Sequence, residues 1–267
     1  MKLTISVAQV RVTQSRPEEN LRKGESLIAE AARRKSRLIC FPEMWTTGFN
    51  WAENERSCRD HEKMIDRIGE LAKRYGIWVS GSTLALNDQG KVSNTHILFG
   101  ADGSRRGTYR KTHLFSMLHE ERHVAAGNVL SVVDTPWGLT GLAVCYDIRF
   151  PELFRSYALM GARIILSPMA MPHPRLEHWK VLVRARAIED QLFMAGANQV
   201  GSEDFGPGNT LTYFGHSCII DPWGETAAEA GETEEELITA TVDLARVDDV
   251  RAKMSVLKDR RPELYKL

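Results

Sequence analysis

The chain has 267 residues, with 35 basic and 35 acidic side chains, so its formal net charge is zero. This balance argues against nucleic acid as a partner, because phosphate binding needs a basic surplus. Hydrophobic residues make up 43% of the chain, which is enough for one large core or two small ones. No apolar run approaches the length of a membrane span, and residues 1–7 alternate like a strand rather than a signal peptide. We therefore expect a cytoplasmic protein with no membrane partner.

The four cysteines stand far apart in the chain and include no C-x-x-C pair. They are Cys40, Cys58, Cys145 and Cys218. Such spacing is not typical of a disulfide framework or of a structural zinc site. We expect reduced thiols, no metal and no cofactor.

The first half of the chain alternates predicted strands with predicted helices. Proline and acidic residues within 15–19 mark a helix start, and residues 61–75 repeat apolar side chains at helical spacing. Apolar or alternating runs predict strands over residues 3–10, 37–41, 77–84, 92–99 and 107–110. This alternation is typical of an α/β protein.

The second half continues the alternation. Helices are predicted over 151–160 and 176–190, and strands near 129–134, 139–144, 163–166, 192–199, 215–221 and 237–242. Residues 31–42 resemble 158–168, and the strand pair within 77–99 resembles that within 192–221. One interpretation is two similar halves, each a sheet with helices on one face, packed sheet to sheet. The alternative is the ordinary alternation of an α/β chain. In both cases we expect a single domain of residues 1–267.

Cys145 has a position that suits nucleophilic chemistry. It follows the apolar run 141–144 and precedes a predicted helix start at Pro151. A helix N-terminus supplies positive potential and free N–H groups, which favour a thiolate. The alternative is a small cysteine buried in the core, where cysteine is common.

Two further reactive side chains follow predicted strands in the same way. Glu43 comes after residues 37–41, and Lys111 comes after residues 107–110. Since the carboxyl ends of strands in an α/β sheet gather at one edge, both can converge with Cys145. Glu43 would take the thiol proton so that Cys145 attacks a carbonyl carbon. Lys111 and the Tyr146 N–H would hold the oxyanion. For Glu43 or Lys111 taken alone, the alternative is an ordinary surface charge.

Three segments around these residues resemble, in order and spacing, the signature segments of the nitrilase superfamily of carbon–nitrogen hydrolases. They are Phe41–Glu43, Arg110–Phe115 and Val144–Glu152. Further matches lie at His178-Trp179, Arg184–Glu189, Gly215–Ser217 and Asp221–Glu225, so the resemblance covers nearly the whole chain. It implies a four-layer α-β-β-α sandwich and a catalytic triad of Glu43, Lys111 and Cys145. It also implies a homodimer or a higher homo-oligomer, in which chains pair through the helix after the cysteine and through C-terminal segments.

The family carries a further glutamate after the lysine, which positions the lysine or the substrate. Glu120 stands seven residues before Gly127, as the glutamate of the family does, and the resemblance gives it this role. The neighbouring Glu121 is the alternative.

Residues 119–123 also fit H-E-x-x-H, the helix signature of zinc proteases. Histidines at i and i+4 share one face of a helix, and Glu120 would serve as the base. The segment lacks a long apolar helical stripe, however, and its spacing suggests no third ligand. A zinc hydrolase at His119 and His123 is therefore a remote alternative to the thiol mechanism.

Within the superfamily, the chain resembles the ω-amidase-like branch, which cleaves monoamides of small dicarboxylic acids such as α-ketoglutaramate. The segments Met44–Phe49, Leu114-Phe115 and Arg260–Tyr265 carry this resemblance. A nitrilase or an N-carbamoyl amino acid amidohydrolase with the same triad stays open. A non-enzymatic binding module would require a lost triad, and all three residues are present.

An anionic substrate needs a cation in the pocket, and the sequence offers Arg175 on a proline-rich loop. The predicted walls are Phe115, Met169 and Trp179. For each of these residues the alternative is ordinary loop packing. Asp147 and Arg149 are interpreted as a structural pair that fixes the turn after Cys145, and a catalytic role for them is the alternative.

Overall fold

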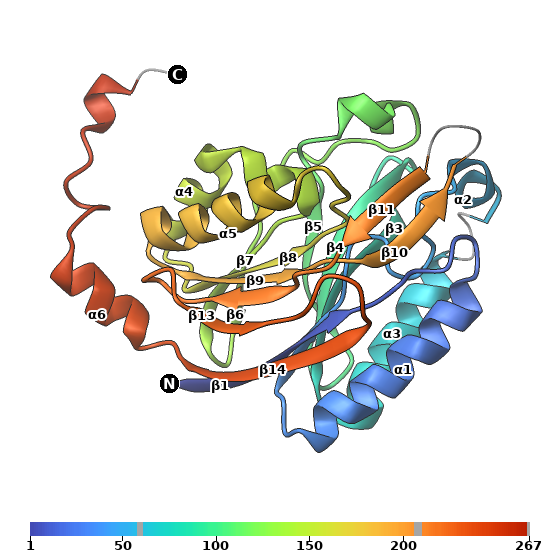
Figure 1. The fold of residues 1–267 in the computed structure, drawn as a ribbon, viewed down its shortest axis with the longest axis horizontal. Coiled ribbons are helices and arrows are strands. Elements are labelled where there is room, and N and C mark those ends of the chain that lie inside the picture. The colour runs from blue at the N-terminus through green and yellow to red at the C-terminus, as the bar shows by residue number, and fades with distance from the viewer. Residues whose placement is uncertain (58–60, 206–209, 266–267) are drawn as a thin grey trace.

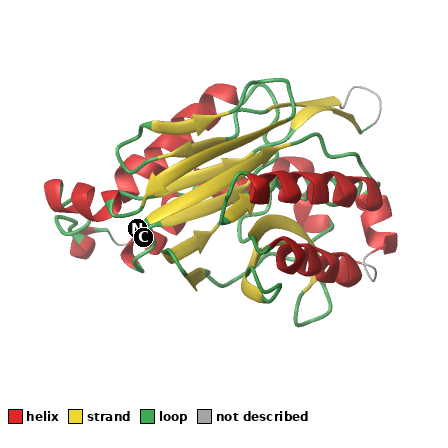
Figure 2. Ribbon diagram, turned by 90° about the horizontal axis from the view of Figure 1, so that it is seen from below, coloured by secondary structure: helices red, strands yellow, loops and turns green. Residues whose placement is uncertain are grey.

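The protein is described by a computed structural model that covers residues 1–57, 61–205 and 210–265. Its elements form four layers, in which two β-sheets lie face to face and helices cover both outer faces (Figure 1). Figure 2 shows the strands enclosed by helices on both sides. The predicted α-β-β-α sandwich is confirmed.

The first sheet has the order β14-β1-β2-β3-β4-β5. Its strands are β1 (Lys2–Gln9), β2 (Leu38–Cys40), β3 (Trp78–Leu86), β4 (Val92–Phe99), β5 (Arg105–Arg110) and β14 (Glu236–Asp243). Strands β1, β2 and β3 run parallel to one another, and β4 runs antiparallel to both β3 and β5. Strand β5 therefore points in the same direction as β2. Their carboxyl ends, which precede Lys111 and Glu43, lie at the same edge of this sheet.

The second sheet repeats much of this plan with the order β13-β12-β9-β8-β7-β6. Its strands are β6 (Val132–Thr135), β7 (Gly138–Leu142), β8 (Ile164–Pro168), β9 (Phe193–Ala197), β12 (Cys218–Ile220) and β13 (Thr226–Glu229). Strands β7, β8 and β9 are parallel, and antiparallel β12 follows β9 as β4 follows β3. The likeness of the two halves is thus present in the strand arrangement.

Two helices cover each sheet. Helices α1 (Pro17–Arg33) and α3 (His61–Tyr75) cover the first, and α4 (Pro151–Leu159) and α5 (Leu176–Asp190) cover the second (Figure 1). Proline opens both α1 and α4, where its missing N–H breaks no helical hydrogen bond. The described residues also contain two shorter helices, α2 (Trp51–Ser57) and α6 (Arg246–Lys253).

The inner faces of the two sheets meet in a shared core. Ile5 and Leu38 of the first sheet and Leu142 and Leu166 of the second are all fully buried in it. Each such side chain contributes about 1.5–3 kcal/mol through burial. The sheets are therefore held together firmly, and so are the strand ends that carry the candidate reactive groups.

The structure adds a hairpin that the sequence analysis missed. Strands β10 (Val200–Asp204) and β11 (Thr210–Phe214) form a separate two-stranded antiparallel sheet. The polar residues of β10 obscured its strand pattern. The strand predicted over 192–199 ends at Ala197, and the one predicted over 215–221 begins only at Cys218.

Among the described residues, no helix is both long and apolar enough to cross a membrane. Cys40, Cys145 and Cys218 carry free thiols, as predicted. Cys58, the fourth predicted thiol, lies outside the described residues.

Candidate active site

A cavity of about 230 Å³ opens where the strand ends of both sheets meet. Glu43 lines it after the end of β2, Lys111 after the end of β5 and Cys145 after the end of β7. The sequence analysis placed them at one edge of a single sheet, whereas the structure draws them from two sheets. The cavity thus joins the two halves of the molecule.

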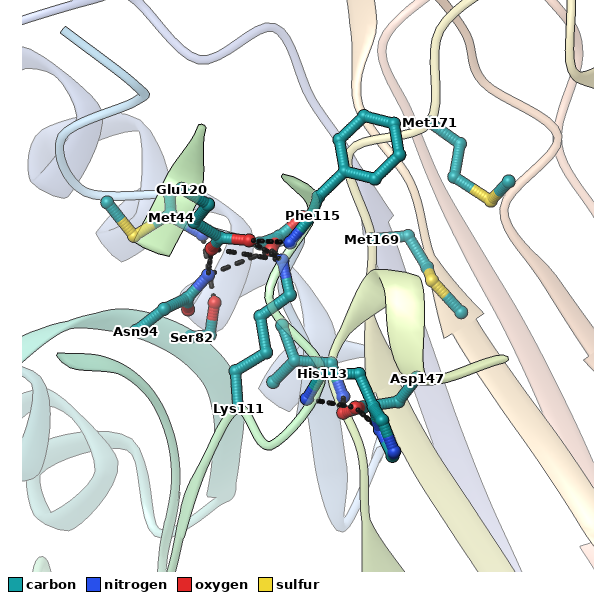
Figure 3. Close-up of polar contacts among 12 residues, drawn as sticks. Met44, Ser82, Asn94, Lys111, His113, Phe115, Glu120, Asp147, Met169 and Met171 are labelled. Carbon is teal, nitrogen blue, oxygen red and sulfur yellow. Dashed lines mark hydrogen bonds and ion pairs between the residues drawn. The ribbon is translucent and has the colours of Figure 1, made fainter. Parts of the chain in front are cut away.

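Lys111 is buried between two carboxylates. Its Nζ lies 2.8 Å from Glu43 Oε1 and 2.8 Å from Glu120 Oε2. All three side chains belong to residues that are at most 2% exposed, so each charge is stabilised by its neighbours rather than by water, with one ammonium facing two carboxylates. Figure 3 shows Lys111 reaching toward Glu120 and Asn94. Nζ also lies 3.0 Å from Glu120 Oε1, so each of the three N–H donors of the ammonium group has a carboxylate acceptor in the resting site.

Asn94 orients the carboxylate of Glu43. Its Nδ2 donates to Glu43 Oε1 at 2.8 Å and lies 3.4 Å from Glu120 Oε1. Because Glu43 Oε1 already accepts from Asn94 and Lys111, the other oxygen of Glu43 is left for the Cys145 thiol. The sequence analysis did not identify Asn94, which lies inside β4 with no motif of its own.

The structure places Glu120 rather than Glu121 against Lys111. Glu120 lies in the short 3₁₀ helix η3 (Glu120–Arg122), and its Oε2 accepts the Phe115 N–H at 2.7 Å. Glu121 is exposed and faces the His119 ring at 3.6 Å. Of the two glutamates, only Glu120 is positioned for the accessory role.

Burial changes the acidity of this cluster. It raises the pKa of Glu43, because water no longer stabilises the carboxylate, although Lys111 opposes the rise. Burial alone would lower the pKa of Lys111, but the carboxylates of Glu43 and Glu120 outweigh it, and that pKa is raised. Lys111 therefore stays charged at neutral pH, while Glu43 is a stronger base than a surface carboxylate.

Cys145 stands on a sharp turn between β7 and the 3₁₀ helix η4 (Cys145–Arg149). Its φ is +42°, a left-handed conformation that costs a non-glycine residue about 1–3 kcal/mol. Asp147 holds this turn, since its Oδ2 accepts both the Val144 N–H and the Tyr109 hydroxyl at 2.8 Å. The strained turn presents the sulfur to the cavity.

The pair predicted between Asp147 and Arg149 is wrong. The fully buried Asp147 carboxylate instead lies 2.7 Å from His113 Nδ1 (Figure 3). The Arg149 guanidinium donates to His178 Nδ1 at 3.2 Å and lines the cavity. Residues two apart on a helical turn do not face each other, which explains why these two charges separate.

The Cys145 thiol keeps its proton in the resting site. Burial and the Glu43 carboxylate raise the pKa of Cys145 well above its ordinary value, against the opposing effects of Lys111 and an N–H of Ala170. The expectation that the following helix favours a thiolate is therefore wrong, because α4 begins only at Pro151 and the effects of burial and the Glu43 carboxylate raise the pKa of the thiol instead. The thiol donates a hydrogen bond to Glu43, so its proton has a direct path to that base.

The cavity walls differ in part from those predicted. Phe115 and Arg175 line the cavity, with the Arg175 guanidinium 5.4 Å from the centre of the Phe115 ring. Trp179 does not line it, because its ring is packed in the core beneath α5 and donates to His216 O at 2.9 Å. Met169 is also fully buried, and it acts through its backbone O, which accepts the Glu43 N–H at 3.1 Å.

Several lining residues were not identified from the sequence. They are Arg149, Met171, Phe205, Leu211 and Tyr213. Leu211 and Tyr213 lie two apart on β11, so they face the same side of that strand. The spacing of Leu211 and Tyr213, two residues apart, was the one signal in the sequence for this wall of the cavity.

The H-E-x-x-H segment does not form the helix that a zinc site requires. His119 has a φ of +51° and separates two short 3₁₀ helices. His119 and His123 therefore do not share a helix face. The His123 ring stacks on Trp51, with the ring centres 5.1 Å apart. In the described parts of the chain, no group of three His, Cys, Asp or Glu residues is arranged to hold a metal ion. Glu120, the glutamate of this segment, contacts Lys111 instead.

Comparison with known proteins identifies the family. The carbon–nitrogen hydrolase family matches residues 4–252. A 2-oxoglutaramate amidase of Bacillus subtilis is 36% identical over 99% of this chain and 100% of that protein. The Omega-amidase NIT2 of Danio rerio is 33% identical over 99% of this chain and 96% of that protein. A crystal structure of a carbon–nitrogen hydrolase from Helicobacter pylori G27, 25% identical, matches 99% of this chain and 97% of that chain with a TM-score of 0.92.

The chain therefore belongs to the carbon–nitrogen hydrolase family, the nitrilase superfamily that the sequence motifs indicate. It is a hydrolase of carbon–nitrogen bonds, and its named relatives are amidases. Both the family and the class of enzyme match the prediction.

The neighbouring glutamates Glu120 and Glu121 offer a matched pair of variants. We expect Glu120→Gln to lower kcat/KM for amide hydrolysis about 10- to 100-fold, the scale of one lost hydrogen bond between charged groups. Glu121→Gln, which changes the same group on the exposed side, should stay within twofold of wild type. Equal effects in the two variants, measured by ammonia release, would contradict the assignment of Glu120.

Proposed function

We propose that this enzyme is an ω-amidase, which hydrolyses the terminal amide of a short dicarboxylic acid monoamide, such as 2-oxoglutaramate, and releases ammonia. The observation that carries the proposal is a single cavity that holds Glu43, Lys111 and Cys145 together with Arg149 and Arg175. The first three suit attack on an amide, and the arginines suit a substrate carboxylate. The printed activities of relatives at 36% and 33% identity support the same substrate class.

In the first half-reaction, Glu43 takes the thiol proton as the Cys145 sulfur attacks the amide carbon. The carbonyl oxygen becomes an oxyanion, which accepts the N–H of Tyr146 and one N–H of Lys111 that turns away from Glu120 Oε1. Tyr146 lies in the first turn of η4, where N–H groups lack acceptors within the helix. The C–N bond then breaks, Glu43 gives its proton to the leaving nitrogen, and ammonia departs from a thioester on Cys145.

In the second half-reaction, a water molecule gives a proton to Glu43 and attacks the thioester carbon. The same donors hold the new oxyanion, the C–S bond breaks, and the proton returns from Glu43 to the sulfur. The carboxylic acid leaves, and the resting enzyme is restored. The 1% exposure of Glu43 matters here, because bulk water would weaken its coupling to the sulfur.

Arg149 and Arg175 are the candidates that bind the acid group of the substrate. Both line the cavity, and neither is ion-paired with a carboxylate in the part of the chain that the structure describes. A guanidinium without a carboxylate partner binds a substrate carboxylate through charge-assisted hydrogen bonds. Apolar lining residues such as Phe115 and Met171 suit the methylene groups between the two ends.

We further propose a cytoplasmic homodimer. The mechanism needs a reduced Cys145, and the described cysteines are free. Exposed apolar side chains gather on α4, α5 and the segment after α6. They are Leu159 and Met160, Val181 and Ile188, and Met254, Leu264 and Tyr265. Beyond α6 the chain extends away from the body to the 3₁₀ helix η5 (Pro262–Leu264), which suits contact with a second copy (Figure 1).

The dimer is tested by sedimentation equilibrium. Wild type should have twice the mass of one chain, and Val181→Glu combined with Ile188→Glu should shift it to monomer, because both charges would be buried in the interface. Val129→Glu, at another exposed valine, should remain dimeric. A wild-type monomer at micromolar concentration would contradict the proposal.

The activity is tested by ammonia release from a panel of substrates. The panel contains 2-oxoglutaramate, succinamate, butyramide, a short nitrile and an N-carbamoyl amino acid. We expect the highest kcat/KM for the two dicarboxylate monoamides, and loss of activity in Cys145→Ala. A preference for the nitrile or the carbamoyl compound, or full activity of Cys145→Ala, would contradict the proposal.

Succinamate and butyramide are close in length and differ in the acid group. Comparing them therefore isolates the contribution of the arginines to binding of that group. Arg175→Met should raise KM for succinamate about 10-fold or more, the scale of one hydrogen bond to a charged group, and leave butyramide within twofold. Arg33→Met on the outer helix α1 is the control and should change neither substrate. An equal effect on both amides would remove Arg175 from acid recognition.

A further inference from the structure

Tyr213 lines the cavity but has no part in the mechanism above. It lies on β11, and an isolated bridge joins it to Pro172. The neighbouring Thr212 O accepts the His173 N–H at 2.9 Å. The hairpin is thus attached to the loop of residues 169–175, and together they form one wall of the cavity.

The same loop contacts both reacting groups. Met169 O accepts the Glu43 N–H at 3.1 Å, and the Ala170 N–H donates to the Cys145 sulfur. Pro172, the bridge partner of Tyr213, follows only two residues after Ala170. The bridge therefore attaches Tyr213 to the same loop that contacts Cys145 and Glu43.

Tyr213 differs from the other buried tyrosines in the described chain. Tyr109 donates its hydroxyl to Asp147 at 2.8 Å, and Tyr157 donates its hydroxyl to Leu142 O at 2.6 Å. Tyr213 is only 3% exposed, yet its hydroxyl has no hydrogen-bond partner within residues 1–57, 61–205 and 210–265. Buried tyrosine hydroxyls usually find a partner, and the side left for one here is the cavity.

The surroundings keep this hydroxyl protonated. Burial raises the pKa of Tyr213 well above its ordinary value, and the negative charges of Glu203, Glu43 and Cys145 raise it further. A neutral phenol is a hydrogen-bond donor. Tyr213 lines the same cavity as Glu43 and Cys145, where a bound amide would offer this hydroxyl an acceptor.

We propose that Tyr213 contacts the substrate and donates a hydrogen bond from its phenol O–H to the oxygen of the reacting amide. This inference rests on the proposed amide hydrolysis. A tetrahedral oxyanion accepts three hydrogen bonds, so Tyr213 adds a third donor to Lys111 and the Tyr146 N–H. The bond strengthens as negative charge develops on the oxygen, and it therefore favours the transition state over the bound substrate.

The test compares Tyr213→Phe with wild type on succinamate and butyramide. The variant keeps the ring and loses only the hydroxyl. We expect kcat/KM to fall about 10- to 100-fold, by the same factor for both amides, because both present the same reacting oxygen. Loss of an arginine contact, by contrast, would lower kcat/KM for succinamate alone. Tyr213→Leu should show a loss at least as large and serves if the phenylalanine variant does not fold.

Two controls separate substrate contact from a structural role. Tyr75→Phe removes a hydroxyl that lies 3.1 Å from Glu25 on the outer helices and should leave activity unchanged. Methyl methanethiosulfonate, a small reagent without an amide, should modify Cys145 of Tyr213→Phe within twofold of the wild-type rate, as followed by mass spectrometry of the Cys145 peptide.

Three results would overturn the proposal: activity of Tyr213→Phe within twofold of wild type, a parallel loss of Cys145 reactivity, or a loss confined to succinamate. Wild-type inactivity on both amides would instead overturn the proposed amide hydrolysis, and this inference with it.

Discussion

Three charged side chains buried in one cluster determine the geometry of the rest of the site. Glu43, Lys111 and Glu120 are each at most 2% exposed, and Lys111 lies within hydrogen-bond distance of both carboxylates. Removing charges from water is costly, and only close, well-oriented partners offset that cost. The cluster is therefore stable in one geometry, which fixes where the ammonium can meet an oxyanion and where Glu43 can meet a thiol proton.

The candidate site is built from both sheets. Glu43 and Lys111 come from the first sheet, and Cys145 comes from the second. Polar contacts cross between the halves close to the reacting groups. Gln199 Nε2 donates to Glu43 O at 2.8 Å, and His96 Nδ1 lies 3.1 Å from Ala143 O, two residues before Cys145. The shared apolar core and these contacts together hold the Cys145 sulfur in register with the Glu43 carboxylate.

Much of this could be predicted from the sequence. Apolar runs and turn residues gave the main helices and strands, and Glu43, Lys111 and Cys145 stood out because each follows a strand. Contacts that depend on tertiary packing could not be predicted. Asn94 carries no local signal, Tyr213 lies on a hairpin with a weak strand pattern, and Arg149 looked like a partner of Asp147. Trp179 was placed in the cavity because the sequence did not show which face of α5 points toward the core.

We propose that Glu43 and Cys145 act on a shared proton, and the pH dependence of the Cys145 reaction with methyl methanethiosulfonate tests this proposal. The Glu43 carboxylate raises the pKa of the Cys145 thiol, so Glu43→Gln should move the midpoint of the rate profile to lower pH while amide hydrolysis is lost. Glu121→Gln should change neither. A midpoint that stays in place or moves to higher pH in Glu43→Gln, or retained hydrolysis in that variant, would show that Glu43 and Cys145 do not act on a shared proton.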